Sequence, residues 1–299
     1  MRHSHVPTSS ILLILGSVLC FTMLDTITKY MTQRYSVPVL VWARYTVQLL
    51  AMLVWLGPSM RLRLFHTKRL PLQVVRGGVL LASSLFFVGA LRSLPLANAT
   101  ALNYTTPVLV VLMARLVLGE RMTPARVAFV VAGLAGMLMI VRPGSDVFRG
   151  ASLLALLAAL CYASYQIMTR VLYGESPRVL LFYPAVVGAV VMTALAPWLA
   201  WPSHMPWQHA VLIVAGGLLG TLGHFLFILA FQHGPASALT PFTYMQLVWA
   251  TLMGWIVYGN FPGGMTIAGM AVIGLSGLLI TLHERRRAMA PVAGPVTVQ

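Results

Sequence analysis

Acidic residues are scarce in this chain. Its 299 residues include five Asp and Glu against 20 Lys and Arg, and charged residues make up only 8% of the sequence. Soluble domains carry about a quarter charged residues, so the composition excludes a soluble globular protein. With 59% hydrophobic residues and a mean hydropathy of +0.86, the sequence indicates an all-α integral membrane protein.

The shortage of acids also excludes most catalytic sites. Glu120, Asp146, Glu175 and Glu284 fall in predicted loops or in the C-terminal tail. The chain has no HExxH or GxSxG motif and no Walker A loop, which argues against metalloprotease, serine hydrolase and ATP-driven functions. His224 has no His, Cys or acid at metal-ligand spacing. We therefore expect no enzyme, no metal site and no cofactor.

Cysteine is rarer still. The two cysteines, Cys20 and Cys161, lie near the middle of predicted spans. We interpret them as small buried thiols, and they do not indicate a redox compartment.

Long apolar runs fill most of the chain. Each is about 17 to 24 residues long, enough to cross a hydrocarbon core of about 30 Å as a helix. The first run lacks a small-x-small cleavage site, so we interpret it as a retained helix rather than a signal peptide. The ten runs lie at roughly 10–31, 37–57, 72–92, 96–117, 124–141, 151–171, 178–200, 208–230, 238–257 and 263–282.

Basic residues separate these runs. If the N-terminus is inside, 13 Lys and Arg lie at inner ends, against Arg34, Arg92, Arg142 and Arg149 at outer ends. Lys and Arg favour the cytoplasmic side of a membrane, so both termini are predicted to be cytoplasmic. A nucleic-acid partner is excluded, because it requires basic residues gathered on one face or tail.

The chain repeats itself. ALRSLPLANATALNYTTPV (90–108) aligns with AFQHGPASALTPFTYMQLV (230–248) after a shift of 140, and LCFTMLDTITK (19–29) aligns with LCYASYQIMTR (160–170) after a shift of 141. An odd number of spans per copy, five, makes the second copy enter the membrane from the opposite side. Inverted repeats of this kind are typical of secondary transporters. The predicted units are 1–145 and 146–287, followed by a disordered tail at 288–299.

The segment ANATALNYTTPVLVVLMARLVLGE, followed by GLAGMLMI, resembles the EamA module of the drug/metabolite transporter superfamily, whose members pair two five-helix modules. The spacing of Lys29 and Arg44 is also similar. Within the superfamily, the aromatic-rich spans are similar to YddG-type aromatic amino-acid exporters. The second module departs from the pattern, since Asn260 stands where the first has Glu120. A role for that acid would therefore not be symmetric.

Asp25 is the one acid inside a predicted span. Residues spaced three and four apart share a helix face, which places an aromatic ring, a hydrogen-bonding group and a hydroxyl in matched stripes of the two copies. Such stripes suit a midplane site for a zwitterion with an apolar side chain, with helix packing as the alternative. The stripes are Phe21, Asp25 and Thr28, and Tyr162, Gln166 and Thr169.

Polar and aromatic residues of spans four, eight and nine extend this candidate substrate site. A few polar groups among aromatic walls suit a small organic ligand. These further candidates are Asn98, Thr100, Tyr104, His224, Tyr244, Gln246 and Trp249.

Three roles for Asp25 stay open. It pairs with Lys29 at i,i+4, pairs with Arg44 at a similar depth, or carries a proton during transport. Two neighbouring cations favour the ionised carboxylate, so we expect an outer-side ion pair that serves as structure or gate.

The sequence thus predicts a multi-pass transporter of the bacterial inner membrane, working by alternating access and functional as a monomer. The resemblance implies export of small metabolites, above all amino acids with aromatic or other apolar side chains. Export of cationic drugs or other metabolites, coupled to protons, is the alternative. A channel or a structural bundle is a further one.

Overall fold

The computed structural model describes residues 8–60, 66–119, 123–141, 150–172, 174–233, 239 and 242–289. These residues form helices and their connections, with no strand among them. Residues 290–299 of the predicted tail lie outside the described residues, and the last helix continues to Met289. The helices are α1 (Thr8–Thr32), α2 (Val37–Met60), α3 (Leu70–Ser93), α4 (Leu96–Asn103), α5 (Thr106–Leu118), α6 (Pro124–Val141), α7 (Gly150–Val171), α8 (Pro177–Leu195), η2 (Ala196–Trp198), α9 (Trp207–His233), α11 (Met245–Tyr258) and α12 (Gly264–Met289).

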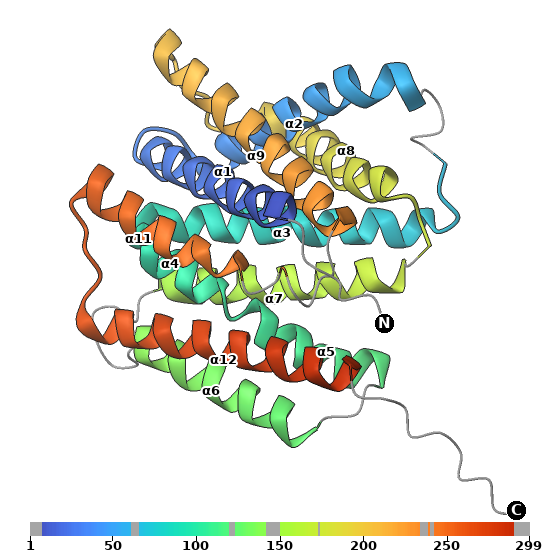
Figure 1. Ribbon diagram of the computed structural model, residues 1–299. Helices are drawn as coiled ribbons and strands as arrows, with labels where there is room; N and C mark the ends of the chain where they lie inside the picture. The colour runs from blue at the N-terminus through green and yellow to red at the C-terminus, as the bar shows by residue number, and fades with distance from the viewer. Residues whose placement is uncertain are drawn as a thin grey trace, which may run out of the picture.

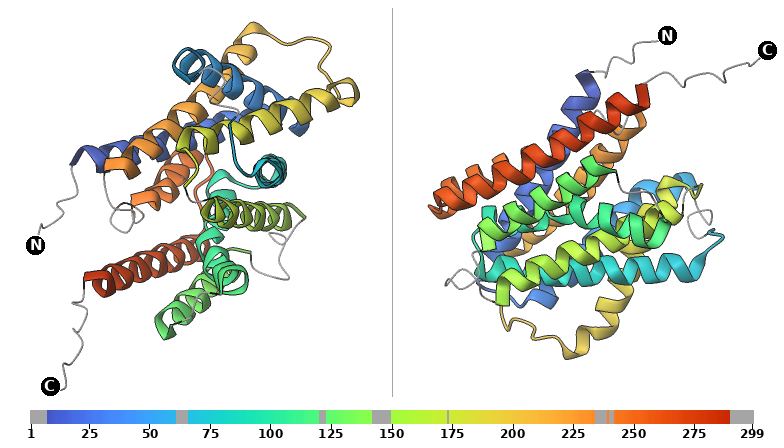
Figure 2. Two further views of the ribbon diagram at one scale, coloured as in Figure 1. Left: turned by 90° about the vertical axis from the view of Figure 1, so that its right-hand side faces the viewer. Right: turned by 90° about the horizontal axis from the view of Figure 1, so that it is seen from below.

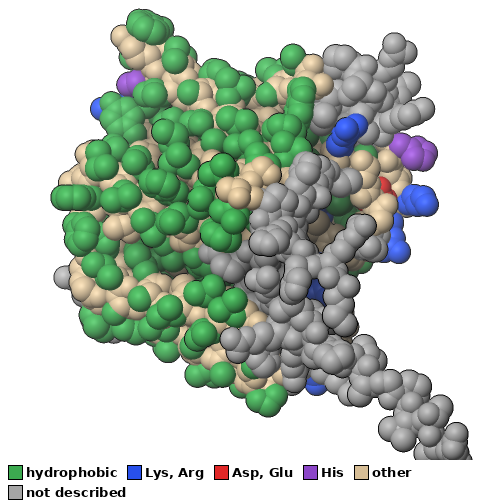
Figure 3. All heavy atoms as spheres, in the orientation of Figure 1, with side chains coloured by type: hydrophobic (Ala, Val, Ile, Leu, Met, Phe, Trp, Pro, Cys, Tyr) green, Lys and Arg blue, Asp and Glu red, His purple; other side chains and the backbone are tan. Residues whose placement is uncertain are grey.

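Seven helical stretches are long and apolar enough to cross a membrane, and Val127–Ile140, Met245–Tyr258 and Gly264–Leu279 form shorter apolar helices. Side chains such as Val54 and Leu116 are 79% and 82% exposed. Figure 3 shows hydrophobic side chains over most of one face, while most of the visible Lys and Arg gather towards the end of the bundle where the C-terminus lies. An apolar belt with basic residues at one end is the surface expected of a membrane protein.

The helices of each half pack mainly against helices of the other half. Helix α1 lies along α9, and α3 lies along α7. In the same way α5 packs on α7 and α11 on α1, while α8 packs on α3 and α2 on α9. Figure 1 shows α1 running away from the end where both termini lie and α7 running towards it. Each of these three interfaces therefore occurs twice, once in each direction of the repeat.

One hydrogen bond occurs in both copies. Ser17 Oγ on α1 donates to the carbonyl of Gly223 on α9 at 2.8 Å, and Ser83 Oγ on α3 donates to the carbonyl of Ala158 on α7 at 2.9 Å. Positions 17 and 158 are equivalent in the repeat, as are 83 and 223. The same pair of positions is thus bonded twice, with the donor and acceptor positions exchanged.

The fourth predicted span is broken. Helix α4 ends at Asn103 and α5 begins at Thr106, with Tyr104 in the turn between them. Pro107 lies in the first turn of α5, where the missing N–H of proline is tolerated. In the second half α11 begins at Met245, directly after a turn at Tyr244. The breaks fall at equivalent positions of the repeat.

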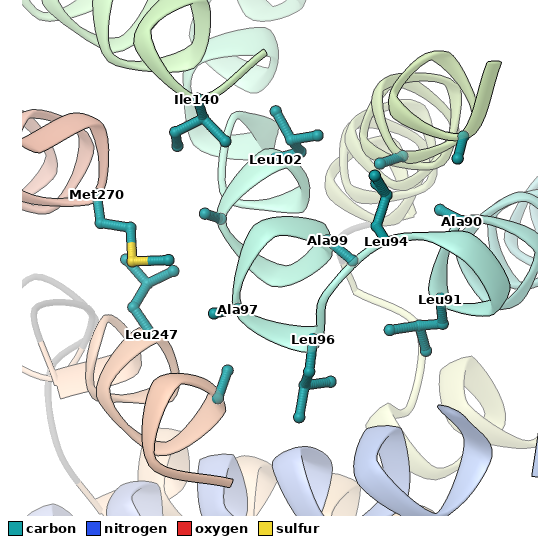
Figure 4. Packing of buried hydrophobic residues seen from close by; sticks show 14 of the residues in the cluster. Ala90, Leu91, Leu94, Leu96, Ala97, Ala99, Leu102, Ile140, Leu247 and Met270 are labelled. Carbon is teal, nitrogen blue, oxygen red and sulfur yellow. The ribbon is translucent and has the colours of Figure 1, made fainter. Parts of the chain in front are cut away.

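Small residues let the central helices approach closely. Figure 4 shows α4 surrounded by side chains of α3, α6, α11 and α12, and the buried Ala97 and Ala99 leave room for them. Helices α6 and α12 meet at glycines: a Cβ on Gly136 or on Gly269 would lie 2.9 or 2.7 Å from the other's carbonyl oxygen. Close backbone contact between small residues is the usual way for helices to associate in lipid. Figure 2 shows the α6–α12 pair to one side of the other helices.

Candidate functional site

The two helix breaks are in direct contact. The rings of Tyr104 and Tyr244 lie with centroids 5.3 Å apart. The Tyr104 hydroxyl donates to the Thr243 carbonyl at 2.6 Å and lies 3.1 Å from Oε1 of Gln246. Broken helices free backbone polar groups at membrane depth, and such groups are tolerated where protein or a water-filled chamber satisfies them.

Asp25 lies beside this junction. Its side chain is 8% exposed on α1, and it interacts electrostatically with Tyr104 and with Arg44 of α2. Arg44 also interacts electrostatically with Tyr162 of α7 and His224 of α9. Residues from five parts of the chain, far apart in sequence, therefore form one cluster that contains both an acid and a base.

Aromatic rings complete the cluster. Phe21 packs edge-on against His224 with centroids 4.8 Å apart, and Tyr162 stacks with Tyr165 at 5.8 Å. Rings offer apolar faces and polar edges to a flat ligand, while Asp25 and Arg44 supply opposite charges. This combination can hold a small molecule that has both a ring and polar groups.

Lys29 does not form the expected i,i+4 pair with Asp25. Its ammonium instead donates to the carbonyls of Leu91 at 3.0 Å and Leu94 at 2.6 Å, and lies 5.5 Å from the centroid of the Tyr258 ring. Carbonyls at a helix C-terminus lack partners within the helix and attract a cation, which explains why Lys29 turns towards the end of α3. Arg44 is left as the cation that interacts electrostatically with Asp25, but the predicted salt bridge between them is not formed among the described residues.

The second predicted stripe differs from the first. Gln166 is exposed, whereas its counterpart Asp25 is buried. Thr169 receives a hydrogen bond from Nη1 of Arg76 at 3.0 Å, so its hydroxyl is engaged on the α3 side. Thr28 is half-buried. The structure thus brings Phe21, Asp25 and Tyr162 into the cluster but does not place Gln166 as the mirror of Asp25.

The remaining candidates lie on α4, α9 and α11. Asn98 and His224 are half-buried. The Thr100 hydroxyl and the Trp249 indole N–H are buried and make no hydrogen bond within the described residues. Two unpaired polar groups on α4 and α11, the helices whose breaks meet at Tyr104, mark the region as one with unused hydrogen-bonding capacity.

Arg76 and Gly277 were not among the site residues predicted from the sequence. Arg76 is fully buried, and its Nη2 donates to Oε1 of Gln73 at 2.7 Å and to the Leu180 carbonyl at 2.5 Å; it looked like one more basic residue at an inner span end. Gly277 faces the Tyr244 hydroxyl so closely that any Cβ there would overlap it. Its place in GLSGLL was the available signal.

Comparison with known proteins decides the family. The profile of the EamA-like transporter family matches residues 8–142 and again residues 149–282. The chain belongs to the EamA-like transporter family. It is accordingly a membrane transporter and not an enzyme, and a multi-pass protein of the bacterial inner membrane, which confirms those predictions from the sequence.

Relatives of this EamA-type transporter carry names of two substrate classes. A riboflavin transporter of Rhizobium johnstonii is 33% identical over 208 residues, covering 69% of this chain and 68% of the relative. A riboflavin transporter of Vibrio cholerae is 25% identical over 293 residues, 96% and 97% of the two chains. An S-adenosylmethionine uptake transporter of Rickettsia bellii is 26% identical over 271 residues, 89% and 90%.

The fold is known from experiment in a distant protein. A crystal structure with 22% sequence identity superposes with a TM-score of 0.67, covering 94% of this chain and 99% of the other.

Proposed function

We propose that this EamA-type transporter moves a small metabolite with a flat aromatic ring and polar or charged groups, by alternating access between inverted repeats. In this proposal the repeats are residues 1–145 and 146–287, ten spans in all, with both termini in the cytoplasm. The cluster of rings and opposite charges beside the Tyr104–Tyr244 junction carries the proposal. In inverted-repeat transporters, substrate sites lie near the midplane where discontinuous helices meet.

Riboflavin is the first candidate substrate. It combines a flat fused-ring system with a hydroxylated chain, and relatives of this chain are named as riboflavin transporters. In this proposal Phe21, Tyr162 and Tyr244 contact the ring. Asn98 and Gln246 hydrogen-bond the polar edge.

Amino acids with aromatic side chains are the second candidate, as predicted from the sequence. Asp25 and Arg44 favour them, because an acid and a base in one cluster match the ammonium and carboxylate of a zwitterion. The direction of transport differs between the two candidates: import for a vitamin, export for amino acids.

Transport into liposomes tests the proposal. Purified protein would be reconstituted and offered riboflavin, S-adenosylmethionine, aromatic amino acids and a cationic drug, each with and without a pH gradient. We expect saturable uptake of a ring-bearing metabolite. Uptake of the cationic drug alone would contradict the proposal and favour the drug-export alternative.

A matched pair of variants connects the uptake to the site. Phe21→Leu removes a ring from the cluster and is expected to raise the KM about fivefold, since an aromatic stacking contact contributes on the order of 1 kcal/mol beyond its buried area. Leu12→Ala changes a side chain on the same helix that is 64% exposed, and should leave the KM unchanged.

A further inference from the structure

Equivalent residues near the two ends of the bundle are buried to different degrees. Asp25 and Lys29 on α1 are each 8% exposed, whereas the equivalent Gln166 and Arg170 on α7 are exposed. Helix α1 also packs against α3, and α7 makes no comparable contact with α9 within the described residues. The two repeats are thus alike in the middle of the bundle and differ near its ends.

A polar tie holds the end where these residues are buried. The Lys29 ammonium on α1 donates to the carbonyls of Leu91 and Leu94, at the end of α3 and just beyond it. The Tyr258 hydroxyl on α11 donates to the Thr26 carbonyl of α1 at 2.5 Å, and the Lys29 ammonium lies over the Tyr258 ring. Three helices meet at these two side chains.

The other repeat cannot build the same tie. Arg170 occupies the position of Lys29, but the position of Tyr258 is taken by Leu118, which has no hydroxyl to donate. The tie therefore depends on the side chains of Lys29 on α1 and Tyr258 on α11, and the duplicated backbone alone does not produce it.

We propose that Lys29 and Tyr258 form a latch that closes the substrate path at the end of the bundle opposite the termini. The inference rests on the proposed alternating access. A buried ammonium needs partners in a low-dielectric interior, and carbonyls supply them in the closed state. When this end opens, water takes the place of the carbonyls as hydrogen-bond acceptor for the Lys29 ammonium, so the ammonium exchanges its partners and does not lose them.

Cysteine labelling tests the latch without any substrate. The natural cysteines, Cys20 and Cys161, would be replaced by Ala, and Thr28→Cys, one residue before Lys29, would report access to the latch. A C-terminal tag would identify the side of the membrane on which the C-terminus lies, and a membrane-impermeant maleimide would be added on the opposite side. With the latch intact we expect slow labelling from that side.

Lys29→Met is expected to raise the labelling rate about tenfold or more, because it removes two hydrogen bonds from a charged donor. Tyr258→Phe removes one hydroxyl and should raise the rate about threefold. Lys29→Arg retains a donor to the carbonyls and should stay near the parent rate. Arg170→Met, at the equivalent exposed position of α7, should leave labelling from this side unchanged.

Two outcomes would overturn the latch. If the labelling rate is unchanged in folded Lys29→Met and Tyr258→Phe, these side chains only join the helices and do not control access. If Arg170→Met raises the labelling rate as much as Lys29→Met does, the effect is a general destabilisation of the bundle. If Lys29→Met does not reach the membrane, Tyr258→Phe carries the test alone, since it deletes a single oxygen. Labelling needs no ligand, so a wrong substrate assignment would show only in the liposome assay.

Discussion

The α1–α9 and α3–α7 interfaces are equivalent in the repeat but differ in chemistry. Both share the serine-to-carbonyl bond, made by Ser17 in one and Ser83 in the other. The α3–α7 interface adds the buried Arg76, whose counterpart in the other interface is Gly216. Duplication has preserved the backbone arrangement while polar side chains diverged. We infer that the Arg76 hydrogen bonds hold α3 and α7 in one fixed arrangement, and we call this interface the clamp. The glycine-rich α1–α9 interface has no such bonds at the equivalent position and is the one where the helices are expected to shift along each other, so we call it the sliding interface.

The largest expected effect comes from breaking the clamp. Arg76→Met leaves the Leu180 carbonyl, the Gln73 amide and the Thr169 hydroxyl without their donor. We expect the free energy of unfolding to fall by about 3 kcal/mol or more, since each buried group left unsatisfied costs about 1–3 kcal/mol. Unfolding in detergent micelles measures this.

The control is Gly216→Ala, whose Cβ would meet Leu24 at an ordinary 3.4 Å. It should change the free energy of unfolding by less than about 1 kcal/mol. Similar losses in Arg76→Met and Gly216→Ala would remove the distinction between clamp and sliding interface.

The next effect separates two glycines of one helix. Gly277→Ala drives a Cβ into the Tyr244 hydroxyl, whereas Gly274→Ala meets nothing within 4 Å. We expect Gly277→Ala to destabilise by about 2 kcal/mol through overpacking and to lower transport by displacing Tyr244. Gly274→Ala should match the parent in melting temperature and uptake, and a defect there as large as in Gly277→Ala would contradict the assignment.

Asp25 and Gln166 give a sharper comparison of the two ends. Asp25→Asn should reduce uptake about tenfold, a loss of about 1.4 kcal/mol of binding or gating energy, and by the same factor at every pH because the carboxylate acts as a charge partner of Arg44. Gln166→Ala, at the exposed end, should change uptake less than twofold. Normal expression of Asp25→Asn with a flattened pH dependence would instead indicate a proton relay.

The smallest effect tests the symmetry itself. Ser17→Ala and Ser83→Ala each remove one buried hydrogen bond, and each should cost about 1 kcal/mol. Thermal unfolding of the two variants side by side should give equal shifts. A cost confined to one of them would show that the shared bond matters in only one interface.

Much of the fold could be predicted because lipid leaves a chain few options. Every backbone group inside a membrane must be bonded within the protein, so apolar runs of sufficient length predict helices, and the repeat at 140 residues predicts which of them are equivalent. The break at Tyr104 was hidden, since Pro107 alone fits a continuous kinked span, and the equivalent break at Tyr244 has no proline at the matching position, which is Leu247.

The site was partly predictable for the same reason. An acidic residue within an apolar run is conspicuous in a sequence, so Asp25 could be predicted as a site residue. The partners of Lys29 were not, because backbone carbonyls leave no trace in the sequence. Arg76 looked like a residue that sets topology. Under the proposed alternating access, the exposures of Asp25 and Gln166 change between states, and a sequence does not encode a single state.

Sidedness of the two repeats tests the central claim most directly. Gln33→Cys, just past α1, and Ser176→Cys, just past α7, occupy exposed positions near the ends of equivalent helices. In a cysteine-free background, an impermeant maleimide added outside intact cells should label the cysteine at 33 at once and the cysteine at 176 only after permeabilisation. Labelling of both from the same side would mean that the repeats are not inverted, which would contradict the proposed alternating access.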